Sequence, residues 1–273
     1  MKKNLLKIAS LALAATAIVG FAACGETKAN YVAKPITGIE VEEYGFAVGK
    51  NSTNKTAILT AMNEVISTAD MSAVVAYYTS VAADETPSVT LEFANLDDNT
   101  GGTLNVYTCS GFEPYEFVVS EEVVGVDIYL MELVAEKLNM KLSVTDMDFD
   151  GICGKVATED NAVGAAGITI NDDRKQTIDF SNPYYSSVQY IISKDSEAFT
   201  SLESLAGKKI GVQKGTTGAL MVEDAIASGV LKDTGAEMVE YDTGAVAYVA
   251  MKANKIDYVV IDELPAQALV KGN

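Results

Sequence analysis

The sequence predicts an α/β fold in which strands and helices alternate along most of the chain. From residue 103 onward, short apolar runs typical of strands are followed by segments with the apolar spacing of helices. Alternation of this kind favours mostly parallel sheets. The chain has 273 residues, of which 48% are hydrophobic, so it can bury one large core or two modest ones.

The strands are predicted from short apolar runs that end at glycine, asparagine or charged residues. The predicted strands cover residues 44–50, 103–108, 141–147, 162–170, 188–194, 208–214, 236–242 and 257–262. Residues 81–102 are rich in Asp, Glu, Thr, Pro, Asn and Gly, and this composition predicts a linker with room for one short strand at 88–93.

Helices are predicted where apolar residues recur every three or four positions. In the segment 54–78 one face carries Ile58, Met62, Val65 and Ile66, and in 125–139 the apolar side carries Ile128, Met131, Leu133, Val134 and Leu138. Further helical segments are expected just after Gly151 and at 201–207, 216–229, 244–254 and 263–272.

The composition excludes several classes of function. The formal net charge is −18, and so acidic a surface is a poor partner for nucleic acid, because phosphate binding needs clustered Lys and Arg. The simplest interpretation of the acidity is solubility. The chain has no histidine, which rules out a His-based catalytic triad and, with so few cysteines, argues against a zinc site. We therefore expect neither a metal nor a cofactor.

The first residues have the pattern of an export signal. Three lysines within the first seven residues precede an apolar run at 8–19, which is too short for a membrane span and suits a signal peptide. The next stretch, Phe-Ala-Ala-Cys-Gly at 21–25, resembles a bacterial lipobox. It implies a signal peptide over 1–23, lipid on Cys24 and a polar tether over 24–35. An ordinary cleaved signal with a chance cysteine is the alternative.

Arg174 is the only arginine in the chain and follows the run "GITINDD". Gly167 allows a close approach to the backbone, and Thr169 offers an N–H and a hydroxyl. A guanidinium reaching over this turn matches a carboxylate better than lysine could. The alternative is a surface ion pair of Arg174 with Asp172 or Asp173.

Two further positions lie where α/β folds place ligands. A strand ending near Gly215 passes into a helix that begins at Thr216 or Thr217, and the free N–H groups of a helix start favour an anion. An ordinary threonine N-cap is the alternative. Asp262 ends a buried strand and could hold an ammonium group, a role that is compatible with capping the following helix.

Together these stretches resemble the bacterial extracellular solute-binding proteins of the polar-amino-acid class, which are the receptors of ABC importers. The resemblance spans most of residues 103–273, and its most specific part is "GITI…DDRK…IDFSNPYY". It also includes "NVYTCSGFEPYEF", "VGVDIYLMELVAEKLNMKL", "LESLAGKKIGVQKGTT" and "KIDYVVIDELPAQALV" in the order of the family. It implies a two-lobed, type II periplasmic-binding-protein fold with the ligand between the lobes.

The resemblance also implies a role for each site residue. The α-carboxylate of an amino acid would be held by Arg174, Thr169 and Thr217, and its ammonium by Asp262 and the Gly167 carbonyl. Phe112 and Phe149 would sandwich the side chain, and Gln213, Ile261 and Cys109 would face its variable end. Many relatives that bind basic or amide side chains carry an acid where Cys109 stands. The absence of an acid at this position favours an apolar or weakly polar ligand.

The order of the segments departs from the family. A segment like 36–66 follows the last helix of lobe 2 in the family, whereas here it precedes the first strand, so we expect a circular permutation; a truncated chain is the alternative. The expected division of the chain is lobe 1 at 36–80 and 103–187, a linker joining the ancestral termini at 81–102, and lobe 2 at 188–273.

The expected function is that of a substrate-binding lipoprotein of an amino-acid ABC importer. It would lie on the extracellular face of the cytoplasmic membrane, on the periplasmic side in a Gram-negative cell, and present its ligand to the permease. We do not expect this protein to be an enzyme. The alternatives are a dehydratase-like enzyme of the same fold, with Glu113 or Asp150 as its acid or base, and a ligand-sensing module. The sequence leaves open whether Cys109 and Cys153 form a disulfide.

Overall fold

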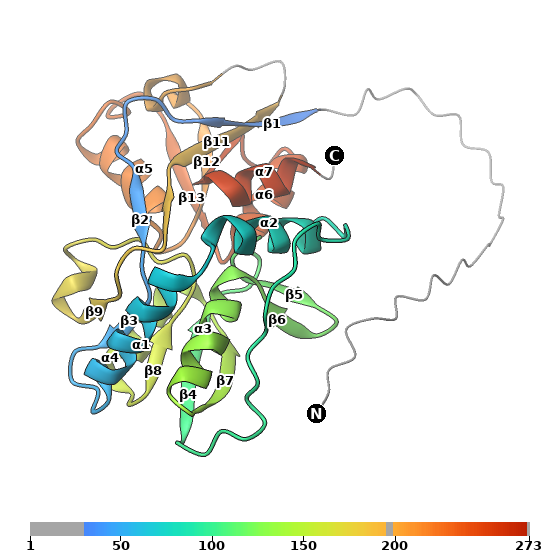
Figure 1. The fold of residues 1–273 in the computed structure, drawn as a ribbon. Coiled ribbons are helices and arrows are strands. Elements are labelled where there is room, and N and C mark those ends of the chain that lie inside the picture. The colour runs from blue at the N-terminus through green and yellow to red at the C-terminus, as the bar shows by residue number, and fades with distance from the viewer. Residues whose placement is uncertain (1–29, 195–198, 272–273) are drawn as a thin grey trace.

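A computed structural model describes residues 30–194 and 199–271. The expected signal peptide and Cys24 lie outside the described residues. The described part contains two five-stranded sheets, each with helices on both faces, stacked one above the other in Figure 1. We call the part built on the lower sheet lobe 1 and the part built on the upper sheet lobe 2.

The sheet of lobe 1 has the strand order β7-β4-β8-β3-β9. Its strands are β3 (Ala47–Gly49), β4 (Thr103–Thr108), β7 (Lys141–Asp146), β8 (Ala162–Gly164) and β9 (Ile178–Phe180). Successive residues of a strand face opposite sides, so Val106 packs towards α1 (Lys55–Thr68) and α3 (Val126–Lys137), and Tyr107 towards α4 (Phe149–Thr158). The sheet is therefore buried on both faces.

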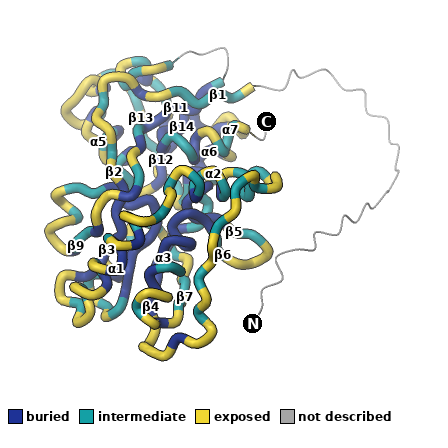
Figure 2. Tube along the Cα trace, viewed as in Figure 1, coloured by how far each residue is buried: buried dark blue, intermediate teal, exposed yellow. Residues whose placement is uncertain are grey.

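The sheet of lobe 2 has the strand order β1-β11-β14-β12-β13. Its strands are β1 (Tyr31–Pro35), β11 (Gln189–Lys194), β12 (Lys209–Gln213), β13 (Glu237–Tyr241) and β14 (Tyr258–Asp262). One face packs on α5 (Thr217–Ala227), and the other on α6 (Gly244–Lys252) and α7 (Glu263–Lys271). In both lobes the buried segments run through the interior of the sheet (Figure 2).

The chain passes between the lobes twice. Residues 36–46 lead from β1 to β3 and contain β2 (Glu42–Tyr44), whereas residues 181–188 lead from β9 to β11 and contain β10 (Tyr185–Ser187). The strands β2 and β10 pair with each other antiparallel, with Tyr185 opposite Tyr44. The two crossing segments therefore form a ribbon that joins the lobes beside the site described below.

The prediction of mostly parallel sheets was only half right. In lobe 1, β4 pairs in parallel with β7 and β8, whereas β3 pairs antiparallel with β8 and β9. In lobe 2, β12 pairs in parallel with β13 and β14, whereas β11 pairs antiparallel with β1 and β14. The antiparallel strands β3 and β11 are the ones that enter a sheet directly from the crossing ribbon rather than through a helix.

Two local predictions were also wrong, and one element was missed. The helical segment 54–78 is two helices, because Ala69 is extended and Asp70 caps α2 (Met71–Ala82) by accepting from the Ala73 N–H. No strand forms at 88–93. A hairpin of β5 (Phe117–Val119) and β6 (Glu122–Val124) was not predicted.

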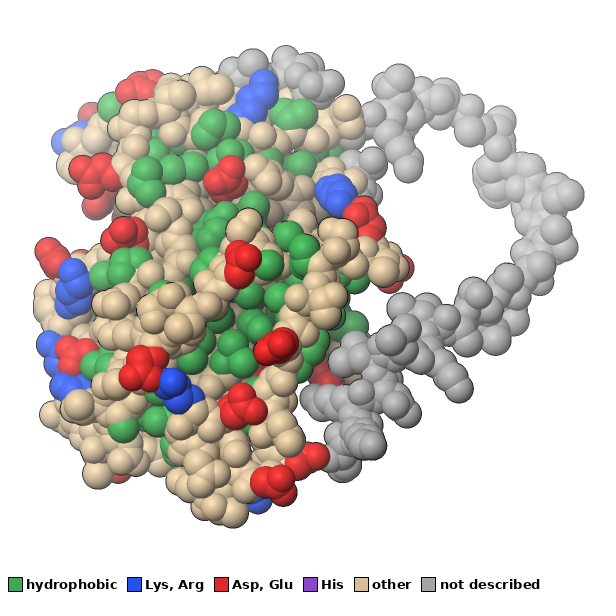
Figure 3. All heavy atoms as spheres, in the orientation of Figure 1, with side chains coloured by type: hydrophobic (Ala, Val, Ile, Leu, Met, Phe, Trp, Pro, Cys, Tyr) green, Lys and Arg blue, Asp and Glu red, His purple; other side chains and the backbone are tan. Residues whose placement is uncertain are grey.

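Residues 83–102 are fixed to lobe 1 by specific contacts. The Asn99 amide donates to the Met140 carbonyl oxygen at 2.8 Å, and the Phe93 ring meets Tyr77 and Tyr129 edge to face. Acidic side chains are scattered over both lobes on the face in Figure 3, where basic ones are fewer. Within the described residues, no helix is both long and apolar enough to cross a membrane.

Candidate functional site

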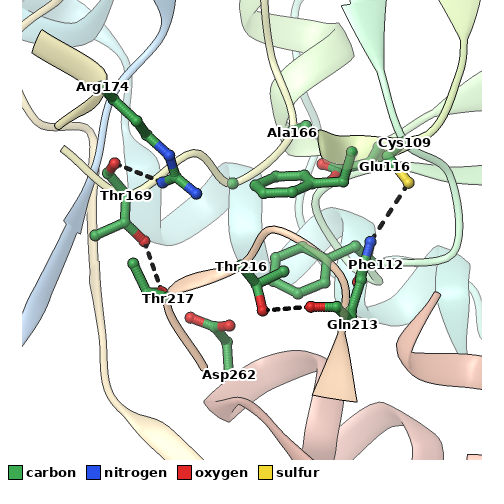
Figure 4. A pocket seen from close by; sticks show the side chains of 12 residues that line it. Cys109, Phe112, Glu116, Ala166, Thr169, Arg174, Gln213, Thr216, Thr217 and Asp262 are labelled. Atoms are coloured by element: carbon green, nitrogen blue, oxygen red, sulfur yellow. Dashed lines mark hydrogen bonds between the residues drawn. The ribbon is translucent and has the colours of Figure 1, made fainter. Parts of the chain in front are cut away.

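A pocket lies between the two lobes. Lobe 1 contributes Cys109, Phe112, Glu116, Phe149, Ala166, Gly167, Thr169 and Arg174, and lobe 2 contributes Gln213, Thr216, Thr217 and Asp262. In Figure 4, Arg174 and Thr169 approach from one side, and Thr217 and Asp262 lie opposite them. The pocket thus draws on both lobes.

Arg174 begins a short 3₁₀ turn and points into the pocket. Its Nη1 donates to the Thr169 carbonyl oxygen at 2.7 Å, and its Nη2 donates to the Gly215 carbonyl oxygen of lobe 2 at 3.1 Å. Its guanidinium carbon lies 5.4 Å from the centre of the Phe149 ring. Burial lowers the pKa of the guanidinium, since the charged form is desolvated. Arg174 makes no ion pair with Asp172, which instead meets Lys175 at 3.3 Å.

Asp262 ends β14 at the floor of the pocket and is 5% exposed. It accepts a hydrogen bond of 2.5 Å from the Tyr44 hydroxyl. Burial, reinforced by the charge of Glu42, raises the pKa of Asp262 to about 7, although hydrogen bonds from Tyr44 and Gln189 act in the opposite direction. A cation beside this carboxyl would favour its ionised form.

The hydroxyls of Thr169 and Thr217 face each other across the lobe boundary, 3.3 Å apart. Both donate to Oε2 of Glu42, at 2.7 and 2.6 Å. Sequence reasoning assigned these hydroxyls to a ligand and missed Glu42. The cap of α5 is Thr216, whose Oγ1 accepts from the Ala219 N–H at 3.2 Å. Thr217 is the first residue of α5, where helix geometry supplies no partner for its own N–H.

Gly167 has a backbone conformation that suits glycine, with φ of +55°, and a Cβ there would lie 2.6 Å from Cε1 of Phe112. Its N–H donates to Oδ2 of Asp127 at 3.0 Å, and the Tyr184 hydroxyl donates to the same carboxyl at 2.7 Å. Burial raises the pKa of Asp127 to about 7, against the effect of both hydrogen bonds. Asp127 therefore positions the backbone of Gly167 at the pocket.

Glu116 is a pocket residue that sequence reasoning did not select. It is 1% exposed, and its Oε2 has no hydrogen-bond partner. Burial, followed by the charge of Asp127, raises its pKa well above the usual value. The only sequence signal was its place in the loop that carries Phe112, since the backbone N–H groups of Gly111 and Phe112 both bond to the Glu116 carbonyl oxygen.

Cys109 and Gln213 lie at the same end of the pocket. The Gln213 amide donates to the Cys109 sulfur at 3.5 Å, and burial raises the pKa of this thiol to about 11. Cys109 and Cys153 are both free thiols, so the structure contains no disulfide between them.

Three residues considered from the sequence do not line the pocket. Ile261 is buried in the core of lobe 2, where its Cδ1 lies 2.2 Å from the position of a Cβ on Gly244 of α6. It is not among the residues that line this pocket. Asp150 pairs with Lys214 at 2.6 Å, and Glu113 lies outside the pocket lining. Neither carboxylate is placed to act as an acid or base there.

Comparison with known proteins supports one family. A model of the bacterial extracellular solute-binding proteins, family 3, matches residues 104–237. The probable histidine-binding protein of Campylobacter jejuni is 29% identical over 181 residues, which cover 66% of this chain and 68% of that protein.

Two solved structures extend the comparison. An ancestral arginine-binding protein bound to arginine is 38% identical, with a TM-score of 0.57, and the match covers 64% of this chain and 76% of the other. An ancestral amino acid-binding protein described as a precursor of cyclohexadienyl dehydratase is 29% identical, with a TM-score of 0.56 and coverages of 62% and 74%. The chain belongs to the bacterial extracellular solute-binding proteins of family 3, and its fold is the type II fold of amino-acid-binding members.

Proposed function

We propose that this protein is the substrate-binding component of an amino-acid ABC importer. It captures a free amino acid between its lobes and presents the closed complex to the permease, while lipid on Cys24 holds it at the outer face of the cytoplasmic membrane. One observation carries the proposal: the partly buried guanidinium of Arg174 and the buried carboxyl of Asp262 lie in the same pocket on different lobes. This is the charge pattern that a zwitterion requires.

The two ends of the amino acid have separate partners. The α-carboxylate binds to Arg174 and to the backbone N–H groups of Thr169 and Thr217, the latter at the start of α5. The α-ammonium binds to Asp262 and to the carbonyl oxygen of Gly167. Because these groups come from both lobes, the ligand stabilises the closed form through contacts that the open form lacks.

The side chain of the ligand meets the end of the pocket that holds Glu116. The sequence favoured an apolar or weakly polar side chain, because no acid stands at Cys109. Glu116 supplies an acid to the same pocket, with one buried oxygen unpartnered. Three carboxyl groups, those of Glu116, Asp262 and the neighbouring Glu42, stand against the single cation Arg174. A cationic group of the ligand beside Glu116 would favour the ionised form of that carboxyl. We therefore propose a ligand with a cationic side chain, which the arginine- and histidine-binding names of the relatives also support.

A thermal-shift screen of the twenty amino acids tests this function. A ligand at 100 times its Kd stabilises the folded state by about 2.7 kcal/mol, which is readily measured. We expect arginine, lysine or histidine to raise the melting temperature most. If no amino acid raises it, the proposed function is wrong, and if only apolar amino acids do so, the role of Glu116 is wrong.

Catalysis is a second candidate because of Glu116. Its raised pKa keeps a proton available in the pocket, as a general acid requires, and one relative is described as a precursor of a dehydratase. Chromatography of a cyclic hydroxy acid incubated with the protein distinguishes the two functions. Turnover that disappears in Glu116→Gln would favour the enzyme, whereas an unchanged compound favours binding alone.

We also propose that the chain is a circular permutation, with lobe 1 formed by 36–80 and 103–187, and lobe 2 by 188–273 with β1 completing its sheet. The family match begins after the segment that supplies β1, β2 and β3. In addition, α7 packs against β1, so the end of α7 could be joined to the start of β1. A rearranged chain, opened after Thr86 and joined from Lys271 to Tyr31 through glycine-serine segments of several lengths, should fold and melt like the original. Failure of every length would favour a truncated chain.

A further inference from the structure

Glu42 lies in the ribbon that joins the lobes. It is the first residue of β2, opposite Ser187 of β10. Its carboxylate reaches three side chains: Oε2 accepts from the Thr169 and Thr217 hydroxyls, and Oε1 accepts from Nε2 of Gln189 at 3.1 Å. Thr169 belongs to lobe 1, whereas Thr217 and Gln189 belong to lobe 2.

These contacts fix the direction of both hydroxyl groups. A hydroxyl has one proton to donate, and each threonine donates it to Glu42. The 3.3 Å approach of the two hydroxyl oxygens is therefore a consequence of their shared acceptor rather than a separate bond. The hydrogen bonds from Thr169 and Thr217 to the Glu42 carboxylate thus link a residue of lobe 1 to a residue of lobe 2.

We propose that Glu42 is an interlobe acceptor that sets how much of the ligand-free protein is closed. Glu42 can bond to Thr169 and Thr217 at the same time only when the lobes are together, so the pair of bonds favours the closed form before an amino acid arrives. When a ligand binds tightly only to the closed form, its apparent affinity is proportional to the fraction of the protein that is closed. Glu42 therefore tightens ligand binding without touching the ligand.

The opposite effect is the competing interpretation. Glu42 could occupy the threonine hydroxyls that a ligand carboxylate would otherwise use, and its removal would then tighten binding. The position of Glu42 in the crossing ribbon, with bonds to both lobes, favours the first role. The two roles predict opposite changes in affinity.

Small-angle X-ray scattering of ligand-free protein provides the first test. The variants are Glu42→Ala and Glu42→Gln, of which the second keeps the shape of the side chain if the first folds poorly. Glu43→Gln is the control, because Glu43 is the next residue of β2 and is exposed. This substitution removes the same charge as the Glu42 variants do. We expect a larger radius of gyration for the Glu42 variants than for the unaltered protein, and no change in the radius of gyration for the control.

Calorimetric titration with L-arginine provides the second test. We expect the Glu42 variants to bind about tenfold or more weakly, as for loss of a hydrogen bond to a charged group, and the Glu43 variant to bind unchanged. Scattering identical to that of the unaltered protein in both Glu42 variants, or tighter binding in them, would overturn the proposal. Since scattering needs no ligand, it decides the role of Glu42 even if the proposed function fails.

Discussion

Arg174 of lobe 1 donates a hydrogen bond through Nη2 to the carbonyl oxygen of Gly215 in lobe 2, at 3.1 Å. The only arginine of the chain thus lines the pocket and also contacts the opposite lobe. Together with the bonds of Glu42 and the bond from Tyr44 to Asp262, it makes the pocket the place where the lobes are joined. Ligand binding and lobe closure therefore depend on the same side chains.

Replacing Gly167 by alanine should weaken both folding and ligand binding. Its φ of +55° is unfavourable for alanine, and the added Cβ would lie 2.6 Å from the Phe112 ring. We expect a loss of about 1–3 kcal/mol in the free energy of unfolding, measured by urea denaturation. Gly154→Ala in α4 is the matched control, since a Cβ there meets nothing within 4 Å, and it should be neutral or slightly stabilising. Equal effects of the two substitutions would contradict this account.

Asp127 should make the folded protein more stable in mild acid. Its pKa is raised from 3.8 to about 7 in the folded state, so the folded state binds the proton more tightly than the unfolded chain does. The resulting stability is fully present below about pH 4 and is lost as the pH rises through 7. Between pH 7 and 5 it amounts to about 2 kcal/mol.

Urea denaturation at pH 5 and pH 8 measures this effect. The difference between the two pH values should shrink in Asp127→Asn, whose side chain has no proton to bind. Asp172→Asn removes the same charge from a side chain that is 99% exposed and should leave the difference intact. A pH dependence unchanged in Asp127→Asn would show that this carboxyl is already ionised in the folded state.

Asp262 should make ligand binding weaken in acid. Its pKa is raised to about 7, and the ammonium group of the ligand favours the ionised carboxyl. Binding below pH 7 must then release a proton, so affinity should fall by up to roughly tenfold per pH unit. Calorimetry in two buffers of different ionisation enthalpy counts the released proton. Affinity independent of pH between 5.5 and 8 would mean that the ammonium group binds elsewhere.

Glu116 should determine preference for a cationic side chain. In Glu116→Gln we expect affinity for arginine to fall by about tenfold or more, because a charge-assisted bond is lost, while affinity for glutamine changes much less. Glu113→Gln, which removes a carboxyl outside the pocket lining, is the control. Equal losses for both ligands would assign Glu116 to folding rather than to specificity.

Much of the pocket could be predicted because its residues stand at the ends of recognisable elements. Thr217 follows a strand and begins a helix, and Asp262 is the last residue of a buried strand. Gly167, Thr169 and Arg174 lie within one short run. Local pattern was enough to place these residues, since the ends of strands in an α/β sheet share one edge.

The missed residues depend on pairings between distant parts of the chain. Glu42 lies near Thr169 because Tyr44 of β2 forms an antiparallel bridge with Thr169, and nothing near Glu42 in the sequence indicates that partner. The hairpin of β5 and β6 turns at Ser120 and Glu121, which adopt φ values of 51° and 71° without a glycine to signal the turn. The antiparallel pairing of β3 and β11 is likewise a consequence of the crossing ribbon.

Titration calorimetry tests most directly whether Arg174 binds an amino acid. The unaltered protein and Arg174→Ala are each titrated with the amino acid selected in the thermal screen. We expect one ligand per chain for the unaltered protein. We expect at least about tenfold weaker binding for the variant, because a charge-assisted bond to the α-carboxylate is lost. Equal affinity of the two proteins would contradict this role of Arg174.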